Sequence, residues 1–168
     1  MIAALVVKIY EMEQKNFDIG QTVGVIVPYR NQIVAIRKAI DHYGIAKLHD
    51  ITIDTVERYQ GSQRKYIIYG FTVQKHYQLN FLTNNVFVDT IDGSLVDRKL
   101  NVAMTRAEEH LIMVGNAQLL ASILTFRRLM DFVRKEQSFF DIPKEDFIKG
   151  DFEVTPYAVR ETTPKGDL

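Results

Sequence analysis

The chain has 168 residues, 46% of them hydrophobic and 25% charged, so it is long enough for one buried core and too apolar for a disordered segment. Lysine plus arginine and aspartate plus glutamate number 21 each, so the overall charge gives no signal for nucleic acid, although a local basic groove stays compatible with it. The absence of cysteine excludes disulfides, thiolate metal sites and cysteine nucleophiles. Without a membrane-spanning apolar run or a signal-sequence pattern, we expect a soluble, cytoplasmic protein.

The first segments of the chain are predicted to form a helix, a strand and a second helix. Apolar residues recur in the first helix at i, i+3, i+4 and i+7. They are Ile2, Leu5, Val6 and Ile9. No capping residue precedes them, so we expect this helix to belong to something longer. Residues 21–27 are nearly all apolar up to Pro28, which favours a strand covered on both faces, as in a parallel sheet. The second helix has an apolar face and ends at Gly44; the face comprises Ile33, Ile36, Ile40 and Tyr43.

The rest of the chain continues this alternation. Strands are predicted at 51–55, 66–73 and 110–115, and a last amphipathic helix at 117–135. In that helix the residues expected to face inward are Leu120, Ile123, Leu124 and Met130. Strands that alternate with helices predict an α/β domain, with a mainly parallel sheet and helices on both faces.

Two other segments have a weaker pattern. Residues 74–96 show no clear period and are expected to form a surface insertion, with turns at 83–85 and 92–93 and one short strand at 86–88. Asp97 can then cap a helix whose apolar residues are Leu100, Ala103, Met104 and Ala107. From residue 139 onward we expect an irregular tail with a frayed end.

Three segments contain residues that could take part in binding or catalysis. We expect them to meet at the carboxyl ends of the strands, where open α/β sheets place their functional residues. Pro28 and Tyr29 follow one strand, residues 55–63 follow another, and Arg106 lies on the short helix before a third. A permanently charged guanidinium held near a strand is better explained by phosphate binding than by a role in keeping the protein soluble. The sequence therefore predicts one composite site.

These segments resemble three ordered motifs of superfamily 1 helicases of the B type, the group of the nonsense-mediated-decay RNA helicase and its DNA-acting relatives. Residues 24–32, Gly-Val-Ile-Val-Pro-Tyr-Arg-Asn-Gln, resemble motif IV. Residues 55–63, Thr-Val-Glu-Arg-Tyr-Gln-Gly-Ser-Gln, resemble motif V. Residues 100–107, Leu-Asn-Val-Ala-Met-Thr-Arg-Ala, match motif VI nearly residue for residue. The order of the three segments and the spacing between them also agree with those of the family motifs.

The resemblance implies the second, carboxyl-terminal of two RecA-like motor domains of the P-loop NTPase type. It assigns residues 1–137 to this domain, with the insertion at 74–96, and leaves 138–168 as a carboxyl-terminal extension. In the family, ATP and Mg²⁺ are bound mainly by the N-terminal RecA-like domain of the same polypeptide. Single-stranded DNA or RNA crosses the top of both domains. These are the expected partners, and no membrane is among them.

By this resemblance Arg106 is the catalytic arginine finger, because a charged guanidinium stabilises the negative charge spread over the transferred phosphoryl group. Its alternative is a surface arginine paired with Glu108 or Glu109. Gln60, Gly61 and Gln63 would bind the nucleotide together with Arg106, the alternative being a plain turn between two strands.

Pro28, Tyr29 and Thr55 would face the nucleic acid. Thr55 can donate its hydroxyl or backbone N–H to a phosphate, and Tyr29 offers a ring to a base or sugar. The alternatives are that Tyr29 only packs on the sheet and that Pro28 is only a junction residue.

The chain departs from the family pattern at three positions. Gln63 replaces a glutamate, Glu57 replaces an aspartate, and Lys65 replaces a common aspartate. Gln63 can still bond a hydroxyl but adds no negative charge, so we expect weakened nucleotide positioning. These departures support an alternative function, a non-catalytic nucleic-acid-binding or regulatory scaffold with a helicase-derived fold.

Two motifs that ATP hydrolysis needs are missing from this sequence. No Gly-x-x-x-x-Gly-Lys-Ser/Thr and no apolar strand ending in Asp-Glu occur, so we expect the chain to be inactive alone and to form half of a longer motor. A small-molecule α/β enzyme is a third hypothesis, which lacks a nucleophile–base arrangement and a glycine-rich cofactor loop. No metal site is predicted, because the histidines lack ligand spacing and the aspartates between 89 and 97 are too loosely grouped.

Overall fold

The computed structural model describes residues 1–59, 62–83, 86–88 and 95–149. Within these residues, four strands form one parallel sheet in the order β2-β1-β3-β6. The strands are β1 (Val23–Val27), β2 (Thr52–Thr55), β3 (Arg64–Gly70) and β6 (Ala107–Val114). In the central strand Val25 lies opposite both Ile53 of β2 and Ile68 of β3. The predicted α/β class with a parallel sheet is confirmed.

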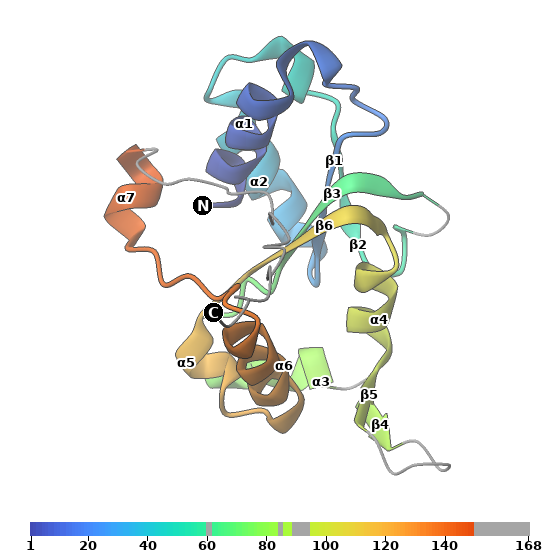
Figure 1. The fold of residues 1–168 in the computed structure, drawn as a ribbon, viewed down its shortest axis with the longest axis vertical. Helices are drawn as coiled ribbons and strands as arrows, with labels where there is room; N and C mark the ends of the chain where they lie inside the picture. The colour runs from blue at the N-terminus through green and yellow to red at the C-terminus, as the bar shows by residue number, and fades with distance from the viewer. Residues whose placement is uncertain (60–61, 84–85, 89–94, 150–168) are drawn as a thin grey trace, which may run out of the picture.

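Helices cover both faces of this sheet, as Figure 1 shows. One face carries α1 (Ile2–Glu13) and α2 (Arg30–Asp41). The other carries α3 (His76–Thr83), α4 (Arg98–Met104), α5 (Ala117–Leu120) and α6 (Leu124–Lys135). The remaining elements are the single turns η1 (Gln14–Asn16) and η2 (Ala46–Leu48), the antiparallel pair β4 (Val86–Val88) and β5 (Leu95–Asp97), and α7 (Lys144–Lys149). None of the described helices is long and apolar enough to cross a membrane.

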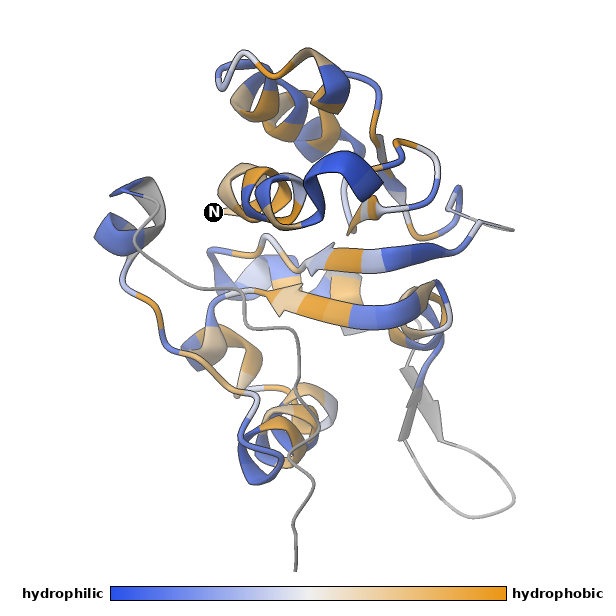
Figure 2. Ribbon diagram, turned by 45° about the horizontal axis from the view of Figure 1, so that its top comes forward, coloured by the Kyte–Doolittle hydropathy of each residue, from blue (hydrophilic) through white to orange (hydrophobic). Residues whose placement is uncertain are grey.

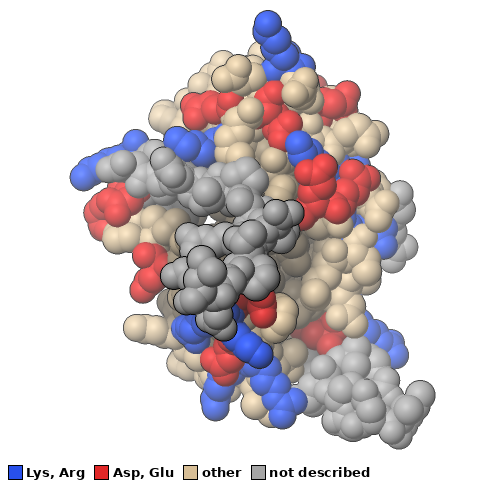
Figure 3. Space-filling model, viewed as in Figure 1, with Lys and Arg blue, Asp and Glu red and all other residues tan. Residues whose placement is uncertain are grey.

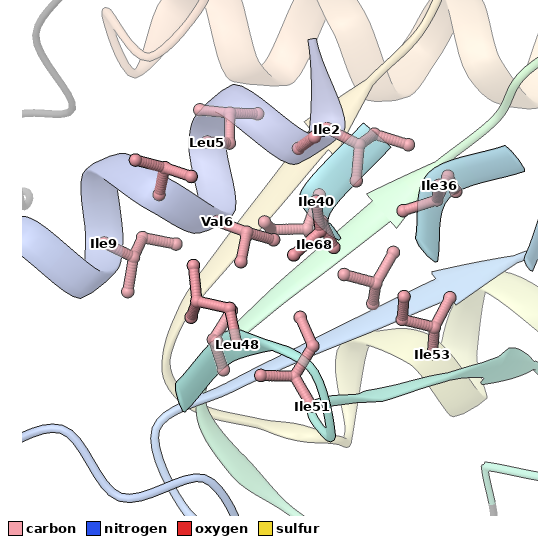
Figure 4. Packing of buried hydrophobic residues seen from close by; sticks show 14 of the residues in the cluster. Ile2, Leu5, Val6, Ile9, Ile36, Ile40, Leu48, Ile51, Ile53 and Ile68 are labelled. Atoms are coloured by element: carbon pink, nitrogen blue, oxygen red, sulfur yellow. The ribbon is translucent and has the colours of Figure 1, made fainter. Parts of the chain in front are cut away.

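The first hydrophobic core lies between α1, α2 and the sheet (Figure 4). The four apolar residues predicted to share a face of α1 are all buried there, together with Ile36 and Ile40 of α2. Every residue of β1 is buried, as expected for a strand covered on both faces. Tyr43, expected on the apolar face of α2, is 45% exposed because the helix ends before it; Gly44 follows at a φ of 67°, a conformation that glycine adopts without strain.

The second core lies on the opposite face of the sheet. Ile67 and Tyr69 of β3 pack against α3, α4, α5 and α6, whose buried residues include Leu82, Ala103 and Phe126. Phe71 and Phe126 meet edge to face, with ring centroids 5.1 Å apart. Figure 2 shows the hydrophobic residues along the strands and on the parts of the helices that face them.

The segment predicted to be a surface insertion contributes to this second core. The short strand at 86–88 is confirmed as β4, but α3 precedes it and buries Leu79 and Leu82. Two leucines three positions apart are too few to reveal a helical period. The predicted turns at 83–85 and 92–93 fall largely on residues outside the described ones.

The helix predicted at 117–135 is two helices, α5 and α6. Asn116 caps α5, and Ser122 Oγ donates to the carbonyl of Leu119 as the first helix ends. Arg127 Nε then donates to the carbonyl of Ala121, across the break. Leu124 begins α6 and is 47% exposed, so its inward placement was wrong. The tail also contains α7, where an irregular course was expected.

Candidate functional site

An open depression of about 480 Å³ lies where β1 and β2 end. Its lining includes Pro28, Tyr29 and Thr55, the three residues predicted to face nucleic acid. They meet because the two strands are parallel neighbours in a register that sets Val27 opposite Thr55. Arg30, Asn31 and Glu57 complete the lining. These three lie inside the motif segments, and only the fold reveals that they share a surface.

Thr55 is buried, and its donors already have partners. Its backbone N–H donates to Asp54 Oδ1 at 2.8 Å. Its hydroxyl bonds the carboxylate of Glu57, two residues further along the turn. The Thr55 carbonyl accepts the N–H of Arg58 at 3.1 Å and of Tyr59 at 2.9 Å, which closes this turn. A phosphate that binds here must therefore displace a bond made within the chain.

Tyr29 is fixed at the depression by a hydrogen bond and by packing. Its hydroxyl donates to the carbonyl of Gln78 in α3 at 2.8 Å, and its ring packs against the second core. Burial, and after it the neighbouring Tyr77, raises the pKa of Tyr29 above its ordinary value of 10.0. The ring thus packs on the sheet side, and it also lines the depression.

Glu57 is charged and paired. Its carboxylate lies 3.0 Å from the Nζ of Lys99 in the first turn of α4. Partial burial favours the neutral form, but hydrogen bonds from its own backbone N–H, from Lys99 and from Thr55 lower the pKa of Glu57 below 4.5. The acidic residue at the rim of the depression is therefore neutralised by a cation from within the chain.

Arg106 lies in the turn between α4 and β6, not on the helix itself. Its carbonyl accepts the backbone N–H of Arg64 at 2.9 Å, which fixes the turn to β3. Its guanidinium bonds to described residues are long and local, from Nε to the carbonyl of Val102 at 3.4 Å and from Nη2 to Thr105 Oγ1 at 3.3 Å.

The alternative for Arg106, a surface ion pair, is not what the structure contains. Among the described residues no carboxylate lies within 4.0 Å of its guanidinium, and Glu109 contacts Lys65 at 3.8 Å and His110 at 3.7 Å instead. Arg106 is therefore a half-buried residue with a fixed backbone, and its guanidinium forms no ion pair with the described residues.

Gln63 contacts the same turn. Its Nε2 donates to the carbonyl of Thr105 at 3.3 Å, so the motif V and motif VI segments touch. Arg64 Nη1 donates to the carbonyl of Gln63 at 2.7 Å, and Nη2 to Thr52 Oγ1 at 3.2 Å. Gln60 and Gly61, the other two predicted nucleotide ligands, lie outside the described residues.

The predicted residues form two groups and not one. Pro28, Tyr29 and Thr55 lie at the carboxyl ends of β1 and β2, whereas Gln63 and Arg106 lie at the amino ends of β3 and β6. The expectation that all three segments share the carboxyl edge was wrong because residues that precede a parallel strand lie at its start. Helix α4 connects the groups, since Lys99 near its start contacts Glu57 and Arg106 follows its end.

No cluster of three or more histidine, aspartate or glutamate side chains that could hold a metal occurs among the described residues. Asp97 caps α4 by accepting the backbone N–H groups of Lys99 and Leu100. His110 stacks on the ring of Tyr66 at 4.8 Å. On the face drawn in Figure 3, basic and acidic side chains are interspersed.

The parallel sheet, its two helical layers and the motif-bearing loops define an α/β domain of the RecA-like class. Residues 1–118 match the family model described as an AAA domain. The chain belongs to this family and is a domain of the superfamily 1 helicase type, as the sequence predicted.

Curated relatives carry helicase names. DNA replication ATP-dependent helicase/nuclease DNA2 of Xenopus tropicalis is 30% identical over 126 residues, which cover 72% of this chain and 10% of that protein. DNA polymerase alpha-associated DNA helicase A of Saccharomyces cerevisiae is 32% identical over 117 residues, which cover 68% of this chain and 15% of that protein. The chain thus matches only a small part of the length of these relatives.

Proposed function

We propose that residues 1–137 form the carboxyl-terminal motor domain of an ATP-dependent DNA or RNA helicase, with 138–168 as an extension. In this role the domain supplies an arginine finger and part of a single-strand binding surface. The observation that carries the proposal is the Arg106 guanidinium, which follows a motif VI helix, has a fixed backbone and lacks a carboxylate partner among the described residues. The cytoplasmic location stays a prediction.

Arg106 would act on ATP bound by the N-terminal RecA-like domain of the same polypeptide, which would also hold Mg²⁺. Negative charge spreads over the γ-phosphoryl oxygens as it is transferred, and a guanidinium that needs no proton to be charged stabilises that state. Gln60, Gly61 and Gln63 would contact the same nucleotide, and Gln63 lies at the same edge of the sheet as Arg106. The bond from Gln63 to Thr105 supports this grouping.

The depression lined by Pro28, Tyr29 and Thr55 would hold the single strand. Contacts from a ring, and from the hydroxyl and N–H of Thr55 once a phosphate displaces Glu57 and Asp54, do not depend on base sequence, which suits a motor that moves along any strand. Arg30 at the lining supplies a cation for a phosphate. Helix α4 could couple strand binding to ATP hydrolysis, because Lys99 near its start contacts the depression and the arginine finger follows its end.

The alternative, a non-catalytic scaffold, rests on the departures at Glu57, Gln63 and Lys65. Each of the three has a partner within the chain: Glu57 pairs with Lys99, Gln63 donates to Thr105, and Lys65 Nζ lies 2.7 Å from Glu13 Oε1. These polar contacts give the three side chains a role within the fold, so the departures by themselves do not favour the scaffold. A scaffold also has no use for an open guanidinium at Arg106.

The test uses the polypeptide that contains this chain and its upstream sequence. We expect a Walker A motif upstream, and we expect Arg106→Ala to lower kcat for ATP hydrolysis by about 10³- to 10⁵-fold while ATP binding is retained. Arg106→Lys should be similarly impaired, because an ammonium cannot make the bidentate contact. Wild-type turnover in Arg106→Ala would contradict the finger role, and ATP turnover by the 168-residue chain alone would contradict the division of labour.

A further inference from the structure

We propose that a second depression, of about 310 Å³, is a nucleobase subsite in which the ring of Tyr77 stacks on a base of the bound single strand. Its lining is Tyr29, Asn31, Gln32, Tyr77 and Gln78. The inference rests on the proposed function, since Tyr29 and Asn31 line both depressions. The two depressions therefore adjoin, and their shared lining connects Thr55 to Tyr77.

The lining of this depression suits bases and not phosphates. All five residues are uncharged: two carry phenol rings and three carry amides. Every base has a face that can stack on an aromatic ring. The amides of Gln32 and Gln78 already bond Thr72, Gln74 and Lys75, so the rings supply the contact to the base. Cations lie beside the depression instead, at Arg30 in the first depression and at the exposed Lys75 just before α3.

Tyr77 is presented outward on a fixed support. Its side chain is 69% exposed, although an aromatic residue in this position could have joined the second core. Leu79 and Leu82 bury the opposite side of α3. A ring carried on a fixed backbone loses less entropy when a base stacks on it than one on a loose segment.

Hydrogen bonds tie the start of α3 to the motif IV loop and to α2. Tyr29 donates to the carbonyl of Gln78 at 2.8 Å, and Gln32 Nε2 donates to the carbonyl of Thr72 at 3.3 Å. Gln78 Oε1 in turn accepts the backbone N–H groups of Gln74 and Lys75. These bonds hold Tyr77 beside Tyr29, so a base that enters the depression meets both residues.

The experiment measures binding of a short fluorescein-labelled oligothymidylate to the 168-residue chain by fluorescence anisotropy. Tyr77→Ala should weaken binding by about 5- to 150-fold, the range that corresponds to loss of one base–aromatic stack. Tyr77→Phe should bind like the wild type, because the ring is retained. Tyr43→Ala is the matched control, since Tyr43 is 45% exposed and follows α2 on the opposite face of the sheet.

An abasic strand of the same length separates stacking from phosphate contacts. We expect the wild type and Tyr77→Ala to bind it equally, because it offers no base to stack. Equal affinity of the two proteins for the oligothymidylate would overturn the subsite and leave the proposed function standing. Failure of the wild type to bind any single strand would overturn the proposed strand surface, and the subsite with it.

Discussion

The Nζ of Lys99 lies 3.0 Å from Oε1 of Glu57, and this pair joins the first turn of α4 to the rim of the strand depression. The two partners differ in burial: the Lys99 side chain is 11% exposed and the Glu57 side chain 57%. A buried ammonium depends on its carboxylate more than an exposed carboxylate depends on its ammonium. Removal of one partner should therefore have a different effect from removal of the other.

Glu57→Gln is expected to lower the free energy of unfolding by about 1 to 2 kcal/mol, because it leaves the buried Lys99 head with a weaker acceptor. Lys99→Met leaves an exposed carboxylate and adds apolar contact, so its cost should be smaller. Urea denaturation at neutral pH measures both. A larger loss for Lys99→Met than for Glu57→Gln would show that the lysine stem, and not the charge pair, stabilises α4.

A second prediction concerns the hydroxyl of Tyr59. This side chain is buried over Gly24, where a Cβ would overlap the hydroxyl, and the hydroxyl has no hydrogen-bond partner among the described residues. Burial raises the pKa of Tyr59 to about 12. Because an unsatisfied buried hydroxyl is costly, Tyr59→Phe should raise the free energy of unfolding by about 1 kcal/mol.

Tyr66→Phe is the matched control for Tyr59→Phe. The hydroxyl of Tyr66 donates to Glu13 Oε1 at 2.7 Å, so the same chemical change there should be destabilising. Thermal denaturation of the two variants and the wild type shows whether each substitution raises or lowers the stability. A loss of stability in Tyr59→Phe would mean that its hydroxyl has a partner, such as a buried water.

The sheet and its helical layers could be predicted from the sequence because the patterns that define them lie within single segments of the chain. The unbroken apolar run before Pro28 indicated a central parallel strand, and β1 is buried throughout. The helix at the start of the chain was equally clear from its spacing. Helix α3 was missed because its eight residues carry no charge contrast, and its place in the fold depends on bonds from the distant residues Tyr29 and Gln32 to Gln78 and to Thr72 just before the helix.

The candidate site was predictable in part. Parallel neighbours end at one edge, which is why Pro28, Tyr29 and Thr55 converge. Two further contacts could not be foreseen. Lys65, interpreted as a departure near the nucleotide, pairs with Glu13 across 52 positions of sequence, and Glu57 pairs with Lys99. Pairings at such separation follow from how the helices and loops pack against the sheet and not from any local pattern.

The pair of Lys65 and Glu13 makes stability depend on pH. The hydrogen bond from Lys65 lowers the pKa of Glu13 below 4.5, although burial opposes the shift, and the bond from Glu13 raises the pKa of Lys65 above 10.5. The stabilisation from Glu13 is therefore present above pH 4.5 and is lost as the pH falls through its lowered pKa. The contribution of Lys65 is lost only as the pH rises above 10.5.

Glu13→Gln should accordingly lose about 1 to 2 kcal/mol of stability near neutral pH, and little in acid. Urea denaturation of wild type and variant across the acid range gives this difference at each pH. The exposed Glu11 of the same helix provides the control, since Glu11→Gln should change stability little at any pH in that range. A gap between wild type and Glu13→Gln that persists unchanged below pH 4 would show that packing, and not charge, holds this contact.

The last prediction separates a residue kept for an external ligand from one kept for the fold. Arg106 and Arg64 are linked through their backbones, yet their guanidinium groups differ. Arg64 bonds Gln63 and Thr52, whereas the bonds of Arg106 to described residues are long ones to Val102 and Thr105. Arg106→Ala should therefore leave the free energy of unfolding within about 0.5 kcal/mol of the wild type, as for an ordinary surface substitution. Arg64→Ala should cost about 1 to 3 kcal/mol, because it removes the bonds to Gln63 and Thr52. Chemical denaturation of both variants measures the contrast, and a loss for Arg106→Ala as large as that for Arg64→Ala would assign its guanidinium to the stability of the domain instead of to a phosphate.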